Sequence, residues 1–159
     1  MEIHQAEEKE LEQVYDLTAG VIREVYPFYY PEPVVKFFLK LHSREEIRKD
    51  IREGNVYLLT DQGECVGTGT WQKRRLSRVF VRADRQKKGY GKAIMDFLEE
   101  KTAKVGRSVL VEASLPGAGF YEKRGYQTFC HHTTPVGDGY MLVYEIMRKN
   151  FSEKEKKDL

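Results

Sequence analysis

A basic, glycine-containing turn near the middle of the chain has the residue types that could bind a phosphate. It spans residues 85–92 and contains Gly89 and Gly91, which place no side chain where a backbone must approach a ligand closely. A turn that opens a helix presents several N–H groups without intrahelical partners, together with the positive end of the helix dipole. Phosphate groups bind such a turn. Additional positive charge comes from Lys87, Lys88 and Lys92.

Two common phosphate-binding motifs do not fit this turn. The dinucleotide fingerprint requires a third glycine where the chain has Ile94, and a Walker A loop requires Ser or Thr where the chain has Ala93. The pattern that fits is Gln-x-x-Gly-x-Gly over residues 86–91, beginning five residues after an apolar stretch ends. The competing interpretation is a surface turn whose lysines are solvated.

The segments on either side of the turn predict a strand and a helix. Residues 76–81 form a short apolar run rich in β-branched and aromatic residues, which is typical of a strand. After the turn, Ile94, Phe97 and Leu98 recur at a helical period. Residues 108–113 predict a further strand. A strand, a helix and a strand joined at this length predict two parallel strands with a right-handed crossover.

The rest of the chain predicts further elements around this unit. Strands are predicted over residues 1–5, 56–60, 65–72, 127–133 and 140–147, helices over 7–25, 34–41 and 43–53, and turns over 61–64 and 135–139. The three successive strands that end at residue 81 predict an antiparallel meander. Residues 26–33 contain three prolines, which exclude a regular helix, and several aromatics that either pack in the core or line a substrate cleft.

The turn and a later segment together resemble the GNAT family of N-acetyltransferases. Residues 121–126 read Tyr-Glu-Lys-Arg-Gly-Tyr, which matches the family's short helix Tyr-x-x-x-Gly-Phe/Tyr. The resemblance spans residues 56–147 and implies an α/β (α+β) fold. In that fold a mixed, mostly antiparallel central sheet has one parallel strand pair that splays for the cofactor, and helices flank it. Two positions depart from the family pattern, because Ser114 replaces a frequent Asn and Ala83 replaces a frequent Pro.

The resemblance implies that acetyl-CoA is the co-substrate and that its pyrophosphate binds the turn. It implies that the backbone of residues 79–81 pairs with the pantetheine arm, with the N–H of Val81 as an oxyanion donor. Arg85 and Gln86 are expected to reach phosphate oxygens. The full set of residues assigned to the cofactor is Val79, Phe80, Val81, Arg85, Gln86, Lys87, Lys88, Gly89, Tyr90, Gly91, Lys92, Ala93, Ser114 and Phe120.

Two side chains are expected to manage protons during transfer. The resemblance assigns the protonation of the departing thiolate to Tyr121, since a phenol with a pKa of ~10 can serve a thiol with a pKa of ~8.5 within hydrogen-bond reach. Glu112, at the end of a predicted strand, is the candidate general base, and a solvated strand-end carboxylate is the alternative. A surface position is predicted for His131 and His132, and a helix cap or surface position for His42.

The remaining residues predict direct transfer to an amine acceptor. No metal-ligand spacing and no Ser/His/Asp or Cys/His arrangement is found, so no metal and no acetyl-enzyme are expected. The acceptor cleft is expected between residues 26–33, the strand over residues 65–72 and the final hairpin. Trp71 and Tyr140 are candidate walls, although an isolated Trp is more often part of the core. The acceptor is the primary amine of a small molecule, a peptide or a protein.

Composition indicates one domain over residues 1–150, followed by a charged tail over residues 151–159. The net charge is +2, and no apolar run is long enough for a membrane span. Two cysteines without a Cys-x-x-Cys pair suggest reduced thiols and a cytoplasmic location. A homodimer is a modest expectation from the family resemblance.

Two other functions compete with catalysis. The basic residues between positions 73 and 92 could form a nucleic-acid surface, although the overall charge argues against it. A non-catalytic acyl-CoA sensor with the same shape is the other alternative.

Overall fold

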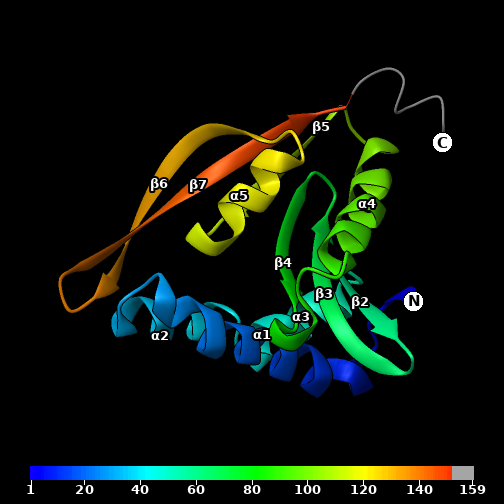
Figure 1. Ribbon diagram of the computed structural model, residues 1–159, viewed down its shortest axis with the longest axis horizontal. Coiled ribbons are helices and arrows are strands. Elements are labelled where there is room, and N and C mark those ends of the chain that lie inside the picture. The colour runs from blue at the N-terminus through cyan, green and yellow to red at the C-terminus, as the bar shows by residue number, and fades with distance from the viewer. Residues whose placement is uncertain (152–159) are drawn as a thin grey trace.

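The computed structural model describes residues 1–151, which form a mixed sheet with helices on both faces (Figure 1). The strands are β1 (Glu2–Gln5), β2 (Val56–Asp61), β3 (Glu64–Gln72), β4 (Arg75–Val81), β5 (Ser108–Ala113), β6 (Gln127–Gly137) and β7 (Tyr140–Asn150). The α-helices are α1 (Leu11–Val25), α2 (Glu32–Leu41), α3 (Arg44–Arg52), α4 (Tyr90–Ala103) and α5 (Leu115–Lys123), with short 3-10 turns at Glu8–Glu10, Tyr26–Phe28 and Ala83–Arg85. The predicted charged tail lies, from residue 152 onward, outside the described residues.

The sheet opens at its single parallel strand pair. The described strands follow the order β1-β2-β3-β4-β5-β7-β6, and only β4 and β5 run parallel. These two strands pair only at Arg75 with Leu110 and at Leu76 with Val111. Strand β4 nevertheless stays paired with β3 as far as Val81. The carboxyl-terminal half of β4 therefore has a partner on one edge only, which confirms the predicted splayed fold.

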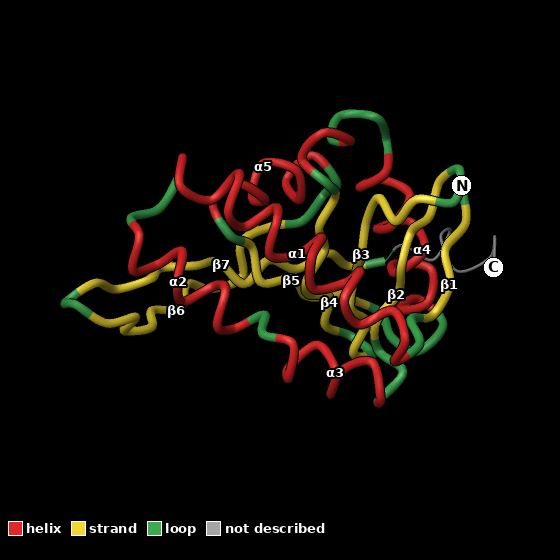
Figure 2. The backbone as a smooth tube through the Cα atoms, turned by 90° about the horizontal axis from the view of Figure 1, so that it is seen from below, coloured by secondary structure: helices red, strands yellow, loops and turns green. Residues whose placement is uncertain are grey.

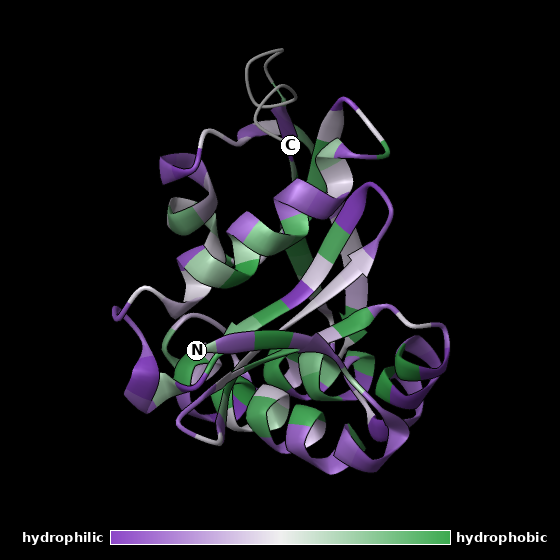
Figure 3. Ribbon diagram, turned by 90° about the vertical axis from the view of Figure 1, so that its right-hand side faces the viewer, coloured by the Kyte–Doolittle hydropathy of each residue, from purple (hydrophilic) through white to green (hydrophobic). Residues whose placement is uncertain are grey.

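The helices divide into two groups on opposite faces of the sheet. The described core residues of α1, α2 and α3 pack with Phe80, Leu142 and Leu58, whereas those of α4 and α5 pack with Leu76 and Val109. Figure 2 views the molecule from the side of α1, α2 and α3. In Figure 3 the hydrophobic colours gather where these helices face the strands, and the hydrophilic colours lie outside. Burial of one apolar stripe per helix is thus what holds both layers to the sheet.

Two glycines in β3 bring α4 close to the sheet. A Cβ atom at Gly67 would lie 2.6 Å from Ile94 Cδ1, and one at Gly69 would lie 2.7 Å from Leu98 Cδ1. Both distances are below any normal carbon contact, so a side chain at either position would displace Ile94 or Leu98. The two glycines therefore leave the space that these α4 side chains occupy against β3.

Several element boundaries differ from the predictions. Helix α1 begins at Leu11 rather than residue 7, and α2 begins at Glu32 because Pro33 fits in the first helical turn. Strand β6 continues through Pro135 to Gly137, so the predicted turn over residues 135–139 is shorter than expected. A proline fits here because β6 is an edge strand. Among the described helices, none combines the length and the hydropathy that crossing a membrane requires.

Candidate active site

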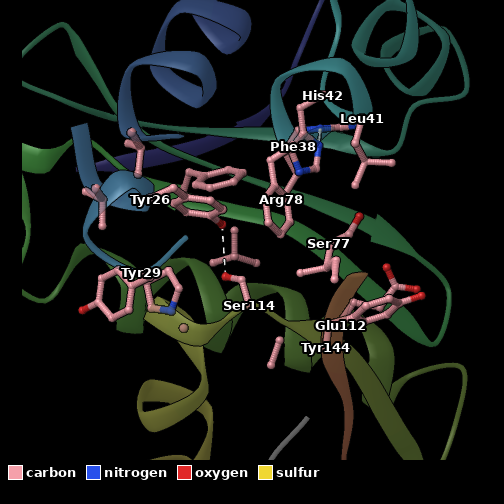
Figure 4. A pocket seen from close by; sticks show the side chains of 18 of the residues that line it. Tyr26, Tyr29, Phe38, Leu41, His42, Ser77, Arg78, Glu112, Ser114 and Tyr144 are labelled. Carbon is pink, nitrogen blue, oxygen red and sulfur yellow. Dashed lines mark hydrogen bonds between the residues drawn. The ribbon is translucent and has the colours of Figure 1, made fainter. Parts of the chain in front are cut away.

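A cavity of about 460 Å³ lies where β4 and β5 separate (Figure 4). Residues 77–81 of β4 form one wall, and residues 112–117 at the junction of β5 and α5 form another. Helices α1 and α2 and the turn between them cover it with apolar and aromatic side chains, and β6 and β7 complete it. Of the residues predicted to act on the cofactor or in catalysis, the lining includes Val79, Phe80, Val81, Gln86, Glu112, Ser114 and Tyr121.

The backbone of β4 directs polar groups into the gap beside β5. The N–H of Arg82 donates to Val66 O of β3 at 3.0 Å. Backbone groups alternate between the two edges of a regular strand, so the N–H group of Val81 points toward the opposite edge. Gln86 Nε2 donates to the carbonyl oxygen of Val81 at 3.1 Å from that edge. The gap therefore has strand-type donors and acceptors available for an extended molecule.

The turn predicted to bind phosphate does open a helix. Gly89 adopts a left-handed conformation with φ of 89° and immediately precedes α4. The first i to i+4 bond of the helix is donated by Ala93 N to Gly89 O at 3.0 Å. The N–H groups of residues 90–92 thus lie in the first turn, where intrahelical acceptors are missing. This geometry suits a phosphate, as the sequence pattern predicted.

Several charged side chains of this turn are engaged by neighbouring carboxylates. Arg85 Nη2 donates to Glu64 Oε2 at 2.6 Å, the Tyr90 hydroxyl donates to Asp61 Oδ2 at 2.6 Å, and Lys92 Nζ donates to Asp96 Oδ2 at 2.6 Å. The backbone of the turn is consequently the better phosphate ligand. Phe120 packs beside it, since a Cβ atom at Gly91 would meet the Phe120 ring at 3.5 Å.

Tyr121 of α5 lies at the cavity with its ring held by two aromatic neighbours. The residue is 8% exposed, and its ring contacts those of Phe120 and Tyr126 at centroid distances of 5.4 and 5.6 Å. Burial, assisted by the nearby Tyr26, raises the pKa of the Tyr121 phenol. The phenol is therefore protonated at neutral pH and available as a proton donor, which is the state that a general acid needs.

Ser114, at the N-cap of α5, joins the cavity wall to the helix cover above it. Its Oγ atom lies 3.0 Å from the Tyr26 hydroxyl, which Figure 4 shows as a dashed line. One residue later, Leu115 N donates to the Tyr30 hydroxyl at 2.7 Å. The Ser114 hydroxyl faces the cavity region but is already engaged, so its predicted contact with the cofactor would have to be shared.

Glu112 is brought to the same cavity as Tyr121. It sits one residue before the end of β5, and its carboxylate is half-exposed. Arg75 Nη1 lies 3.1 Å from Glu112 Oε1. The carboxylate is accessible from the cavity and from solvent, so it can exchange protons with bulk water.

The predicted acceptor walls are partly wrong. The lining of the cavity includes no residue of β3 and neither Trp71 nor Tyr140. The indole of Trp71 donates to Thr102 Oγ1 of α4 at 3.0 Å and carries Lys101 on its ring, so it lies on the opposite face of the sheet. Strand β7 contributes Leu142 and Tyr144 instead. Both interpretations of the aromatic segment hold, because Tyr26 and Tyr30 pack in the core and Tyr26 and Tyr29 line the cavity.

A polar cluster at the edge of the cavity was missed by the sequence analysis. His42 caps the C-terminus of α2, as predicted, but it is half-buried and lines the cavity. Arg78 adopts a left-handed backbone conformation with φ of 49° at a bulge in β4. This bulge turns the Arg78 side chain toward α2 and α3, where it reaches Asp50 and His42. A pattern of alternating residues cannot reveal such a bulge.

The two cysteines and the adjacent histidine pair lie outside the cavity lining. Cys65 and Cys130 are free thiols, and His131 and His132 are exposed. Within residues 1–151 no group of three or more His, Cys, Asp or Glu residues has the arrangement of a metal site.

Most arginines of the basic stretch are paired: Arg75 with Glu112, Arg78 with Asp50, Arg82 with Asp84, and Arg85 with Glu64. This pairing disfavours a nucleic-acid surface, because phosphates would have to displace the carboxylates.

A sheet that opens at one parallel strand pair, with a helix N-terminus and a buried tyrosine beside the gap, defines an acyltransferase fold. A family model described as an acetyltransferase (GNAT) domain matches residues 25–143. The chain therefore belongs to the GNAT family of acetyltransferases. A comparison with curated protein sequences gives no significant match.

Solved structures of the same fold cover nearly the whole chain. A GCN5-related N-acetyltransferase from Rhodopseudomonas palustris is 19% identical, with a TM-score of 0.85 over 94% of this chain and 95% of its own. PaiA N-acetyltransferase from Thermoplasma acidophilum, solved with coenzyme A, is 17% identical, with a TM-score of 0.73 over 94% and 98%. YncA from Salmonella typhimurium, solved with acetyl-CoA, is 15% identical, with a TM-score of 0.64 over 96% and 95%. At these identities the likeness establishes the fold.

Proposed function

We propose that the protein transfers the acetyl group of acetyl-CoA directly to a primary amine. The observation that carries the proposal is the opening between β4 and β5, because it combines free strand-edge groups with a phosphate-type helix N-terminus and a protonated tyrosine. The two relatives solved with coenzyme A or acetyl-CoA have the same fold. A pantetheine arm is an extended chain with two amides, which suits the unpaired edge of residues 79–81.

The proposed roles of the residues follow from their positions. The N–H groups at the start of α4 hold the pyrophosphate, and Gln86 and the loop lysines supply further donors and positive charge. The N–H of Val81 points into the gap and stabilises the negative charge that develops on the thioester oxygen. Glu112 accepts a proton from the amine, directly or through water, so that the nitrogen lone pair can attack the carbonyl carbon. Tyr121 donates its proton to the sulfur as the carbon–sulfur bond breaks.

The acceptor enters from the side of α1 and α2, where apolar and aromatic side chains cover the cavity. A small-molecule amine or the amine of a peptide is the proposed partner. The free thiols of Cys65 and Cys130 are in keeping with a cytoplasmic location, which remains a proposal together with the homodimer.

The first test is a calorimetric titration of the native protein with acetyl-CoA, repeated with Gly89→Glu. The variant places a carboxylate at the start of α4, where it repels the pyrophosphate. We expect the dissociation constant to rise at least about 100-fold, equivalent to about 3 kcal/mol. Absence of binding to the native protein would overturn the proposed function.

Gly139→Glu is the matched control for this experiment. Gly139 also has a positive φ, of 75°, and like Gly89 it has no atom within 4 Å of a built Cβ. The control therefore carries the same backbone strain and the same charge, but in the turn between β6 and β7. Its affinity for acetyl-CoA should match that of the native protein.

Turnover separates an enzyme from a sensor. After binding is established, release of free coenzyme A thiol is measured in the presence of a panel of primary amines. Thiol release that depends on the amine supports acetyl transfer. Tight binding of acetyl-CoA with no thiol release on any amine would favour the sensor.

A further inference from the structure

The polar cluster formed by Asp50, Arg78 and His42 has no role in the proposed acetyl transfer, yet it borders the cavity. Arg78 Nη1 donates to Asp50 Oδ2 at 2.7 Å and to Thr70 Oγ1 at 3.1 Å. Arg78 Nε donates to His42 Nδ1 at 3.4 Å. The Arg78 side chain is 6% exposed, so its charge is compensated by Asp50 inside the protein. The guanidinium is thus held in place by three elements.

This arrangement selects one tautomer of His42. A guanidinium can only donate hydrogen bonds, so the Nδ1 atom that it contacts must present its lone pair. A neutral imidazole then carries its proton on Nε2, which becomes a hydrogen-bond donor. Burial, with a contribution from the charge of Arg78, lowers the pKa of His42 to about 3. The ring is therefore neutral at physiological pH, and it is a poor general base because its one basic nitrogen already accepts from Arg78.

The Nε2–H group of His42 is available to a ligand. His42 lines the cavity, and within residues 1–151 no hydrogen-bond partner is found for Nε2. Figure 4 places the ring at the edge of the cavity beside Phe38 and Leu41. The bond that Nδ1 accepts from a charged donor also polarises the ring and strengthens Nε2–H as a donor. A ligand that displaces water from this edge of the cavity must offer the Nε2–H group an acceptor atom in exchange.

The position of His42 relates this donor to the reaction centre. Its ring meets the Phe80 ring edge-on at a centroid distance of 5.6 Å. Phe80 immediately precedes Val81, whose N–H is proposed to hold the thioester oxygen. The donor therefore lies on the same face of β4 as the Phe80 side chain, which is the face that α1 and α2 cover. An oxygen bound there would belong to the acceptor, which is proposed to enter from this side.

From these contacts we infer that the acceptor is an apolar amine that carries a carbonyl or carboxylate oxygen near its nitrogen, and that His42 binds this oxygen through Nε2–H. Free α-amino acids, their amides and the N-termini of peptides share this chemistry. The inference rests on the proposed acetyl transfer and names its substrate class.

The charges around the cavity argue against a polycationic acceptor. Among the residues that line the cavity, Glu112 is the sole carboxylate, and it already lies 3.1 Å from Arg75. Arg78 adds a positive charge that Asp50 compensates. A polyamine would therefore have one shared carboxylate for several ammonium groups. The remaining lining from α2 is apolar, with Phe37, Phe38 and Leu41, which suits an apolar side chain next to the amine.

Two matched amines test the inference. L-phenylalaninamide and 2-phenylethylamine share the amine and the phenyl ring, but only the first carries a carbonyl oxygen. The two amines also differ in basicity, so the ratio of their kcat/KM values is compared between native protein and variant at one pH. We expect His42→Phe to lower the native preference for the amide by about tenfold, the effect of one hydrogen bond, whereas His42→Gln, which keeps an N–H donor, should retain part of it. A short peptide with an N-terminal Phe distinguishes a free amino-acid derivative from a peptide as the source of the oxygen.

The matched control is His131→Phe, which changes an exposed histidine on β6 and should keep the native ratio of the two kcat/KM values. Three results would overturn the substrate class: a native protein that does not prefer either amine, an unchanged ratio in His42→Phe, or binding of acetyl-CoA without acetylation of either amine. Each of them would leave the proposed function standing. Absence of acetyl-CoA binding would instead overturn the proposed function itself.

Nuclear magnetic resonance of the native protein tests the same inference without a variant. Nitrogen-15 spectra of His42 should show a neutral ring with the proton on Nε2 between pH 5 and pH 8. A proton on Nδ1, or an imidazolium ion in this range, would contradict the proposed donor even if His42→Phe failed to fold.

Discussion

The Tyr26 hydroxyl lies 3.0 Å from Ser114 Oγ, although the two residues are 88 positions apart in the chain. Tyr26 belongs to the turn that follows α1, and Ser114 is the N-cap of α5. A parallel contact joins the Tyr30 hydroxyl to Leu115 N. These two bonds connect the cover of the cavity to the helix that carries Tyr121. The same two contacts therefore fix the position of the cavity's helical cover relative to the helix that carries the proposed proton donor.

Loss of this contact should reduce stability. Ser114→Ala leaves the Tyr26 hydroxyl, which is buried, without its partner, and we expect the free energy of unfolding to fall by about 1–3 kcal/mol. Tyr26→Phe removes the other partner. Because the two hydroxyls share one hydrogen bond, the double variant should lose less than the sum of the two single losses. Urea unfolding of the four proteins measures this coupling, and strictly additive losses would show that the two hydroxyls do not interact.

Replacement of the proposed acid should slow transfer without weakening cofactor binding. Tyr121→Phe keeps the ring that packs on Phe120 and Tyr126 but removes the proton donor. We expect kcat to fall about 100-fold, with the dissociation constant of acetyl-CoA nearly unchanged. Because burial raises the pKa of the Tyr121 phenol, native kcat should not decline through loss of this proton below about pH 10.

Tyr126→Phe is the control for this experiment. The Tyr126 hydroxyl donates to Glu99 Oε1 at 3.0 Å and so points away from the cavity. This variant should lose some stability and keep its kcat. Equal kcat values for native protein and Tyr121→Phe would remove Tyr121 from the mechanism.

Replacement of the proposed base should have an effect that depends on pH. In Glu112→Gln no carboxylate accepts the proton of the amine, so kcat/KM should fall about 100-fold near neutral pH. The loss should shrink at alkaline pH, where more of the amine is already neutral in solution. The fold should tolerate the change, because the exposed pair with Arg75 contributes at most about 1 kcal/mol.

Glu145→Gln removes a partly exposed carboxylate from β7, where it pairs with His131, and serves as the control. Its rate profile should follow that of the native protein. A pH-independent loss in Glu112→Gln, or no loss at all, would indicate a structural carboxylate.

His42 should make the folded state sensitive to acid. Its pKa in the folded protein, about 3, is below the ordinary value of about 6.5, so the unfolded chain binds more protons between these values. The stability that comes from burying the neutral ring is complete above about pH 6.5 and is lost as the pH falls toward 3, by up to about 1.4 kcal/mol per pH unit. Urea unfolding between pH 7 and pH 5 should show a shallower dependence for His42→Gln. Equal slopes would contradict the lowered pKa.

Much of the cofactor side could be predicted from local sequence patterns. The run over residues 76–81, the turn that contains Gly89 and the helix that follows are contiguous, so each part restricts the next. Tyr121 was expected from the resemblance of residues 121–126 to the short-helix motif of the family. Such features are encoded within about 30 residues, and no distant contact is needed to form them.

The acceptor side was predicted less well because its walls come from distant segments. Trp71 was a candidate wall of the cleft, with a core position as the alternative. The side chains of β3 alternate between the two faces of the sheet, and the indole lies on the face where α4 packs. His42 was predicted to be a helix cap, and nothing in the residues around it indicates the guanidinium that lies beside it. A bulge at Arg78 places the guanidinium there, because one extra residue in β4 changes the face of the sheet on which the side chains lie.

The amino-acid sequence by itself thus determined the strand, the turn and the helix, because hydrophobic period and glycine placement act over short stretches of chain, while the family resemblance indicated Tyr121. Only the tertiary structure decided which side chains meet across the cavity. The contacts of Tyr26 with Ser114, of Glu112 with Arg75, and of Asp50 with Arg78 each join different elements. Their geometry follows from how the helices pack on both faces of the sheet and from the separation of β4 and β5, neither of which is written in any single segment.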